Sequence, residues 1–280
     1  MNKILIVIGP TASGKTALGL ELAKKFNGEI LSADSRQVYK YMDIGTGKDL
    51  KNFQWGLDLV EPNKQFNVSD FVNYASKILA DIWKRGKLPI IVGGTGLYIK
   101  ELLEPSQTLH IKPDEKLRKK LSKYTLQNLQ KELQEKDLKK WERMNESDRK
   151  NPRRLIRAIE VAGKKTADSI ASLQNDGYDI LIIGLTAPYE FLYQRIDKRV
   201  EERMAMGMAE ERKKLSKYKL INTIGYHNET AQEWKFAEHA YAKRQSDYMK
   251  KFLPKTVWFD ITTKNWKNEV CLTIKNTLNI

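Results

Sequence analysis

The sequence has very little of the residues that build disulfide frameworks and metal sites. It contains one cysteine, Cys271, and three histidines in 280 residues. A single thiol excludes an internal disulfide, and the histidines do not have metal-ligand spacing. No apolar run approaches the roughly 20 residues that a bilayer span requires, so we expect no membrane association. Met1 leads at once into a predicted strand and leaves no room for a signal peptide. We therefore expect a cytoplasmic protein.

Acidic residues are also in short supply. Asp and Glu number 35 against 50 Lys and Arg, which gives a formal net charge of +15 and favours a polyanionic partner. The segment 105–165 contains 18 Lys and Arg but only 9 Asp and Glu, and so carries +9 of that charge. Because this segment is rich in Leu, Lys, Glu and Gln and poor in strand patterns, we interpret it as a helical insertion. Its surface either binds a nucleic acid or is simply solvated.

A complete phosphate-binding loop, G-x-x-x-x-G-K-[ST], lies near the start of the chain. Its members are Gly9, Pro10, Thr11, Ala12, Ser13, Gly14, Lys15 and Thr16. An apolar, β-branched run precedes the loop and a helical pattern follows it, which is the context that its mechanism requires. The loop amides and the helix dipole attract phosphate, and Lys15 adds a positive charge. The Thr16 hydroxyl can ligate the Mg²⁺ that accompanies a di- or triphosphate.

Helical patterns alternate with five short apolar runs, which we predict to be strands: 3–8, 29–33, 88–92, 180–185 and 256–260. This alternation predicts an α/β fold with a doubly wound parallel sheet, whose ligands bind at the carboxyl ends of the strands. With the phosphate loop, it indicates a P-loop NTPase-like core that carries a helical insertion domain. We assign the first part of the core to 1–104, the insertion to 105–178 and the second part of the core to 179–280.

The second apolar run leads to a carboxylate, Asp34, beside the expected position of the phosphate loop. A carboxylate there can hold Mg²⁺ through water, or it can accept a proton from a nucleophile that faces the phosphate. Capping of a helix is the structural alternative. After the third run, the glycine turn at 93–96 repeats the order of strand and glycine turn seen at the phosphate loop.

Motifs over nearly the whole chain resemble those of the bacterial tRNA dimethylallyltransferase (IPP transferase) family. In chain order they are GPTASGKT at 9–16, SADSRQVY at 32–39, MDIGT at 42–46, VGGTGLY at 92–98, PRRLIRAIEV at 152–161, RIDKRV at 195–200, IGY at 224–226 and AKRQ at 242–245. Many kinases share the phosphate loop, whereas its combination with the later motifs is specific to this family.

The resemblance implies an enzyme that uses Mg²⁺ and transfers a dimethylallyl group from dimethylallyl diphosphate to N6 of the adenosine next to the anticodon, position 37 of tRNA. The phosphate loop would bind the diphosphate, with Thr16 on the metal, and Asp34 would be the general base at the adenine. Arg195 and Arg199 match the family's Arg-x-x-x-Arg helix and would clamp the diphosphate. The residues expected to read the flipped base or fill its place are Ser35, Arg36, Gln37 and Thr95. The residues expected to bind the anticodon stem-loop are Arg118, Arg153, Arg154 and Arg157. We expect a monomer.

Three short stretches depart from the family's pattern, and other functions stay open. The departures are Gln54–Gly56, His227–Asn228 and Asp247–Tyr248, and they concern the docking of tRNA rather than the catalytic set. One alternative is a small-molecule kinase with ATP on the loop. Others are a prenyltransferase that acts on free adenine nucleotides and a nucleotide-triggered RNA-binding switch. The basic insertion argues against the kinase and the nucleotide prenyltransferase, because small acceptors need no polycationic surface of that size.

Overall fold

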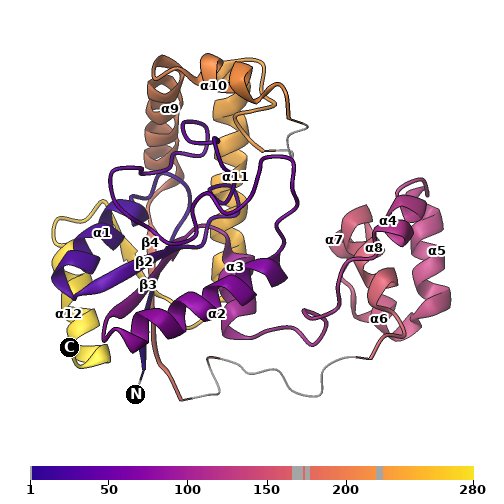
Figure 1. Ribbon diagram of the computed structural model, residues 1–280, viewed down its shortest axis with the longest axis horizontal. Coiled ribbons are helices and arrows are strands. Elements are labelled where there is room, and N and C mark those ends of the chain that lie inside the picture. The colour runs from indigo at the N-terminus through magenta and orange to yellow at the C-terminus, as the bar shows by residue number, and fades with distance from the viewer. Residues whose placement is uncertain (1, 166–172, 174–176, 219–222) are drawn as a thin grey trace. The chain divides into compact units, whose positions relative to one another are not determined.

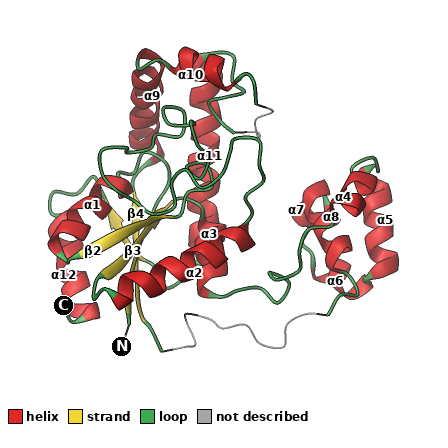
Figure 2. Cartoon of the chain, viewed as in Figure 1, coloured by secondary structure: helices red, strands yellow, loops and turns green. Residues whose placement is uncertain are grey.

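The structure is a computed structural model that describes residues 2–165, 173, 177–218 and 223–280 (Figure 1). The chain divides into two compact units, one formed by 1–104 and 172–280 and the other by 105–171. Figure 2 shows strands in the first unit and helices alone in the second. In the part of the chain that is described, no helix combines the length and apolarity needed to cross a membrane.

The larger unit is built on a parallel five-stranded sheet with the order β2-β3-β1-β4-β5. The strands are β1 (Lys3–Ile8), β2 (Gly28–Ser32), β3 (Leu88–Gly93), β4 (Asp179–Thr186) and β5 (Val257–Asp260). Each lies within one residue of a predicted strand, which confirms the predicted sheet. The runs are recognisable because parallel strands that are covered on both faces are apolar throughout.

Helices cover both faces of the sheet. One face is covered by α1 (Lys15–Lys25) and α12 (Trp266–Leu278), and the other by α2 (Val68–Lys84), α3 (Gly96–Leu103) and the end of α11 (Ala231–Phe252). Alternate side chains of β1 enter the two cores: Leu5 and Val7 pack with α1, whereas Ile4 and Ile6 pack with α2 and α3. In Figure 1, α11 runs beside the sheet and next to α9.

A third core lies beyond that edge. Helices α9 (Tyr189–Ala205) and α10 (Met208–Leu215) pack with α11 around the fully buried Trp234, and the chain after β2 joins them through Val38 and Met42. This packing holds α9, α11 and the loop after β2 around the carboxyl ends of β1 and β2. Three elements that are distant in the sequence therefore enclose the phosphate loop.

The described part of the smaller unit, residues 105–165, contains five helices with a core of their own. They are α4 (Glu115–Leu121), α5 (Leu126–Lys136), α6 (Leu138–Arg143), α7 (Glu146–Arg149) and α8 (Pro152–Val161). Leu121, Leu133 and Leu155 are fully buried within the unit. All five helices begin at an Asp, Asn or Thr whose side chain accepts a backbone hydrogen bond, as expected of stable short helices. The predicted helical insertion is confirmed.

Candidate active site

The loop between β1 and α1 has the backbone geometry of an anion cradle. Gly14 precedes α1 in the left-handed region at φ 86°, and Ala12 also has a positive φ, of 63°. A Cβ on Gly9 would lie 2.7 Å from Ser13 Oγ and 3.0 Å from the Leu185 carbonyl oxygen, so only glycine fits there. The first amides of a helix have no partners within it. Those of α1 are therefore available to an anion.

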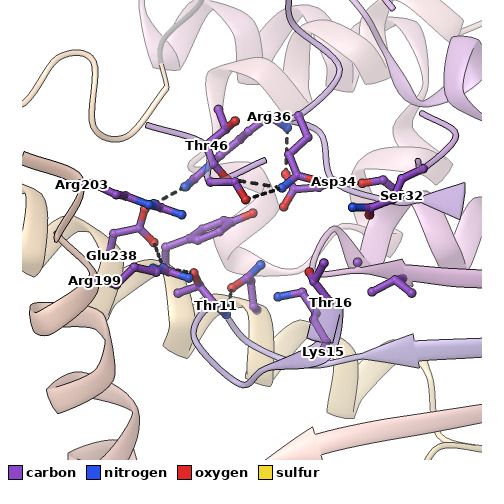
Figure 3. Close-up of a pocket in the computed structure, with 17 residues that line it drawn as sticks. Thr11, Lys15, Thr16, Ser32, Asp34, Arg36, Thr46, Arg199, Arg203 and Glu238 are labelled. Atoms are coloured by element: carbon purple, nitrogen blue, oxygen red, sulfur yellow. Dashed lines mark hydrogen bonds and ion pairs between the residues drawn. The ribbon is translucent and has the colours of Figure 1, made fainter. Parts of the chain in front are cut away.

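Lys15, Thr16 and Asp34 line one cavity, and Asp34 lies across it from the other two (Figure 3). Lys15 Nζ donates a hydrogen bond to the Pro10 carbonyl oxygen at 3.2 Å. Burial lowers the pKa of Lys15 from 10.5 to about 8, although the nearby Asp34 charge opposes the change. An anion in the cavity would raise this pKa again. The Thr16 hydroxyl forms no hydrogen bond with the described residues, so it is free to bind a ligand.

The turn after β2 presents Asp34 to the cavity. Asp34 Oδ1 accepts a hydrogen bond from the Arg36 amide at 2.9 Å, and Oδ2 has no hydrogen-bond partner in the described part of the chain. The Ser35 amide donates to Thr95 Oγ1 at 3.0 Å, which joins this turn to the glycine turn after β3. Ser35 and Thr95 thus fix the backbone beside the carboxylate, and one oxygen of Asp34 is left to accept a proton.

Gln37 has its amide engaged within the protein. Its Oε1 accepts from Ser32 Oγ at 2.9 Å, and its Nε2 donates to the Gly47 carbonyl oxygen at 3.2 Å and the Thr46 carbonyl oxygen at 3.4 Å. These bonds connect β2 to the loop that contains Thr46. In this structure Gln37 shapes the cavity wall, so its predicted contact with a base would require that these bonds break.

The buried carboxylate of Glu238, on α11, lies close to the arginines of the cavity. It is 1% exposed and lies 3.2 Å from Arg36 Nη1 and 3.6 Å from Arg199 Nη2. Arg36 also stacks on the Tyr241 ring at 3.8 Å. Burial alone would raise the pKa of Glu238, but Arg36, Arg199 and Arg203 outweigh it and hold the pKa below its ordinary value. Three guanidinium groups against one carboxylate leave the cavity wall positive, which suits a polyanion.

Helix α9 presents arginines every four residues to the phosphate loop and its surroundings. Arg195 Nε donates to the Ala12 carbonyl oxygen at 2.8 Å, and Arg199 Nη2 bonds Thr11 Oγ1. A second hollow on the outer side of the loop is lined by both arginines together with Lys15 and Thr16. The structure thus brings the two predicted arginines to the predicted phosphate site. Arg203, one turn further along, was not predicted, although the same spacing of four would have indicated it.

Gln245 on α11 was also missed as a site residue. It is 5% exposed; its Oε1 accepts from the Thr11 amide at 2.8 Å, and its Nε2 donates to the Gly94 carbonyl oxygen at 2.9 Å. One side chain thereby fixes the phosphate loop against the glycine turn after β3. Glu238, Tyr241 and Gln245 are spaced i, i+3, i+7 and so lie on one face of α11. That polar spacing was the available sequence signal.

In the smaller unit, two of the predicted RNA-binding arginines hold a buried carboxylate. Glu160 is 1% exposed and accepts from Arg118 Nε at 2.8 Å and Nη2 at 2.9 Å, from Arg157 Nη1 and from the Asp114 amide at 2.7 Å. Burial would raise the pKa of Glu160, but these hydrogen bonds keep it below its ordinary value. Arg118 and Arg157 therefore stabilise the fold of the smaller unit. Their positive charge in the sequence did not indicate this structural role.

The other two predicted arginines are exposed at the start of α8. Arg154 pairs with Asp148, and Arg153 has no side-chain partner among the residues described. The four arginines are therefore not one equivalent set. Arg153 is the one whose guanidinium is available to a phosphate without the loss of an internal bond.

A phosphate loop at the end of a central parallel strand, a facing carboxylate and several arginines define an α/β protein whose cavity suits a polyphosphate beside a proton acceptor. The model of the IPP transferase family matches residues 37–252, and that of the isopentenyl transferase family matches residues 2–57. The chain belongs to the IPP transferase family.

Individual relatives cover almost all of the chain. A tRNA dimethylallyltransferase from Leuconostoc mesenteroides is 38% identical over 92% of this chain and 93% of its own length. The full-length tRNA isopentenylpyrophosphate transferase from Bacillus halodurans has a similar structure, with a TM-score of 0.72 and 30% identity over 100% of this chain and 97% of that one. A eukaryotic dimethylallyltransferase acting on tRNA superposes with a TM-score of 0.83 at 24% identity, over 100% and 80% of the two chains, and supports the fold.

Proposed function

We propose that this protein transfers a dimethylallyl group from dimethylallyl diphosphate to N6 of the adenosine at position 37, next to the anticodon, of tRNA. The observation that carries the proposal is the placement of Asp34 across one cavity from Lys15 and Thr16. A proton acceptor thus faces the candidate diphosphate site across the cavity. Two relatives named above support the proposal, because one is called a tRNA dimethylallyltransferase and the other a tRNA isopentenylpyrophosphate transferase.

The donor diphosphate would lie on the loop amides with Lys15, and Arg195 and Arg199 would neutralise it from α9. Mg²⁺ fits this site, because it prefers oxygen ligands and commonly retains waters and substrate phosphates. Thr16 supplies a free hydroxyl. The described residues contain no group of three His, Cys, Asp or Glu that could hold a metal. Most of the oxygen ligands of the ion would therefore come from the diphosphate and from water. When bound, the ion would stabilise the charge of the leaving group.

The acceptor amine would attack the first allylic carbon of the donor. The new bond is N6–C, the bond that breaks is the allylic C–O bond, and the diphosphate leaves on the phosphate loop. The N6 proton would pass to Asp34 Oδ2. An exocyclic adenine amine is a weak nucleophile, because its lone pair is delocalised into the ring. Placement and proton acceptance are therefore the contributions that the protein must make.

The acceptor would be an anticodon stem-loop rather than a free nucleotide. The smaller unit carries most of the excess positive charge of the chain, and Arg153 on its surface is available to phosphate. We propose that the protein acts as a monomer.

Transfer of label from dimethylallyl diphosphate tests the acceptor directly. The protein would be incubated with the labelled donor and either unmodified tRNA, AMP or ATP, with Mg²⁺ or with EDTA. We expect label in tRNA only, and only with Mg²⁺. Label in AMP or ATP would instead support the nucleotide prenyltransferase, and phosphorylation of a small acceptor from ATP without prenyl transfer would support the kinase.

A further inference from the structure

Gln54 is a buried polar side chain in the cavity that the proposed reaction leaves without a role. It is 7% exposed and lines the same cavity as Asp34. Neither atom of its amide has a hydrogen-bond partner in the described part of the chain. The amide is not among the described buried side-chain atoms that lack a partner, so it is open to the cavity and available to a molecule bound there. An amide left unpaired at the wall of a binding cavity points to a ligand that pairs with it.

The backbone places Gln54 on the acceptor side of that cavity. The Ser32 amide donates to the Trp55 carbonyl oxygen at 2.8 Å, and the Trp55 amide donates to the Ile30 carbonyl oxygen at 2.9 Å. Leu31 and Trp55 form a parallel bridge, so this segment extends the sheet beyond β2. Across the carboxyl edge the order is this segment, β2, β3 and then β1 with the phosphate loop.

Asp34, at the end of β2, therefore lies between Gln54 and the diphosphate site. Neighbouring strands are about 4.8 Å apart, which puts Gln54 roughly 14 Å across the sheet from β1. A diphosphate on the loop amides would therefore meet Asp34 before it met Gln54. The dimethylallyl group has no polar atom that could pair with an amide. The remaining reactant is the base.

We propose that Gln54 determines specificity for adenine in the reaction proposed above. Its Oε1 accepts a hydrogen bond from the N6–H that does not face Asp34. Its Nε2 donates a hydrogen bond to the ring nitrogen beside the amine, N1 or N7. Adenine presents a donor and an acceptor side by side, and a glutamine amide is their complement. On the edge that carries N7, guanine presents two acceptors, O6 and N7, side by side. One of them would then face Gln54 Oε1, which is also an acceptor, so guanine is disfavoured there. This inference rests on the proposed function and assigns the base-reading role to a residue outside the predicted set.

The test combines a change in the residue with a change in the base. Gln54→Leu removes the amide at similar size, and Gln65→Leu, at an exposed position in a nearby loop, is the matched control. The acceptors are synthetic anticodon stem-loops with adenosine, 7-deazaadenosine or 1-deazaadenosine at the target position. The measurements are kcat/KM for each stem-loop, and the dissociation constant of dimethylallyl diphosphate as a check that the cavity is intact.

We expect Gln54→Leu to lower kcat/KM for the adenosine stem-loop roughly 10- to 100-fold, the range of one bidentate base contact. Donor affinity should stay the same, and Gln65→Leu should match the wild type. One of the two deaza substitutions should lower kcat/KM of the wild type about tenfold and leave kcat/KM of Gln54→Leu unchanged, because the amide that pairs with the ring nitrogen is already absent.

The proposal is overturned if kcat/KM of the wild type is the same for both deaza bases as for adenosine, a result that does not depend on the variant's folding. It is also overturned if both penalties persist undiminished in Gln54→Leu. If the wild type modifies no adenosine at all, the proposed function fails and this inference fails with it.

Discussion

Neutralising Glu238 is the most informative perturbation of the arginine cluster. Glu238→Gln keeps the shape of the side chain but leaves Arg36, Arg199 and Arg203 without their shared carboxylate. Removing one partner of a buried ion pair costs about 3–5 kcal/mol, because the remaining charges stay buried and unpaired. For a chain of this size, that loss corresponds to a fall in Tm of roughly 6–20 °C. Glu135→Gln, at an exposed position that faces Lys131 at 3.9 Å, should change stability by less than about 0.5 kcal/mol.

The same substitution makes the cavity more positive, so its stability should depend more strongly on an anion. In a thermal unfolding series, we expect inorganic diphosphate with Mg²⁺ to raise the Tm of Glu238→Gln more than that of the wild type, because the ligand replaces the lost negative charge. The dependence of stability on pH should also change at low pH. The folded pKa of Glu238 lies below its unfolded value, so its stabilising contribution is present above the unfolded pKa and is lost as the pH falls through the folded pKa. Glu238→Gln should flatten that loss. A Tm within 1–2 °C of the Glu135→Gln control, on the scale of roughly 2–4 °C per kcal/mol, would refute the assignment of Glu238 as the centre of the cluster.

The remaining predictions concern the other parts of the site. Asp34→Ala should lower the single-turnover rate about 10²- to 10⁴-fold with little change in donor affinity, and a rate near the wild type at saturating substrates would exclude Asp34 as the base. Donor affinity should fall as the pH rises through about 8, the pKa of Lys15 in the free protein, and Lys15→Arg should abolish this dependence; isothermal titrations from pH 7 to 9.5 would measure it. Gln245→Leu should weaken donor binding by breaking the tie at Thr11, and an unchanged dissociation constant would count against that role. Arg118→Ala should destabilise the smaller unit in urea unfolding, whereas Arg153→Ala should leave stability unchanged and flatten the salt dependence of log affinity for tRNA by roughly 0.7–0.9. The reverse pattern would contradict the division of the arginines.

The sheet and the phosphate loop could be predicted because their signals are local. Buried parallel strands are apolar throughout, and the loop's glycines, Lys15 and Thr16 lie together in the sequence. Asp34 was found for the same reason, since it follows β2, and the carboxyl ends of parallel strands share one edge of the sheet.

Glu238, Gln245 and Gln54 could not be placed in this way. Glu238 and Gln245 are more than 200 residues from the phosphate loop in the chain, and only the packing of α11 beside the sheet brings them to it. Gln54 reaches the cavity through an extra strand segment too short to leave a periodic pattern. In the smaller unit, a count of charges could not distinguish Arg118, which is bound to buried Glu160, from Arg153, which is free at the surface.

The most direct test of the account is a product balance on one unmodified tRNA. Excess protein would be mixed with tRNA, dimethylallyl diphosphate and Mg²⁺ for a single turnover. The digested tRNA would then be analysed by mass spectrometry, and the diphosphate that is released would be measured in the same sample. We predict one dimethylallyl group on N6 of the adenosine at position 37 for each diphosphate released, and about 10²- to 10⁴-fold slower formation of this product when Asp34 is alanine. Diphosphate release without prenylated adenosine, or a dimethylallyl group at another atom or position, would contradict the account.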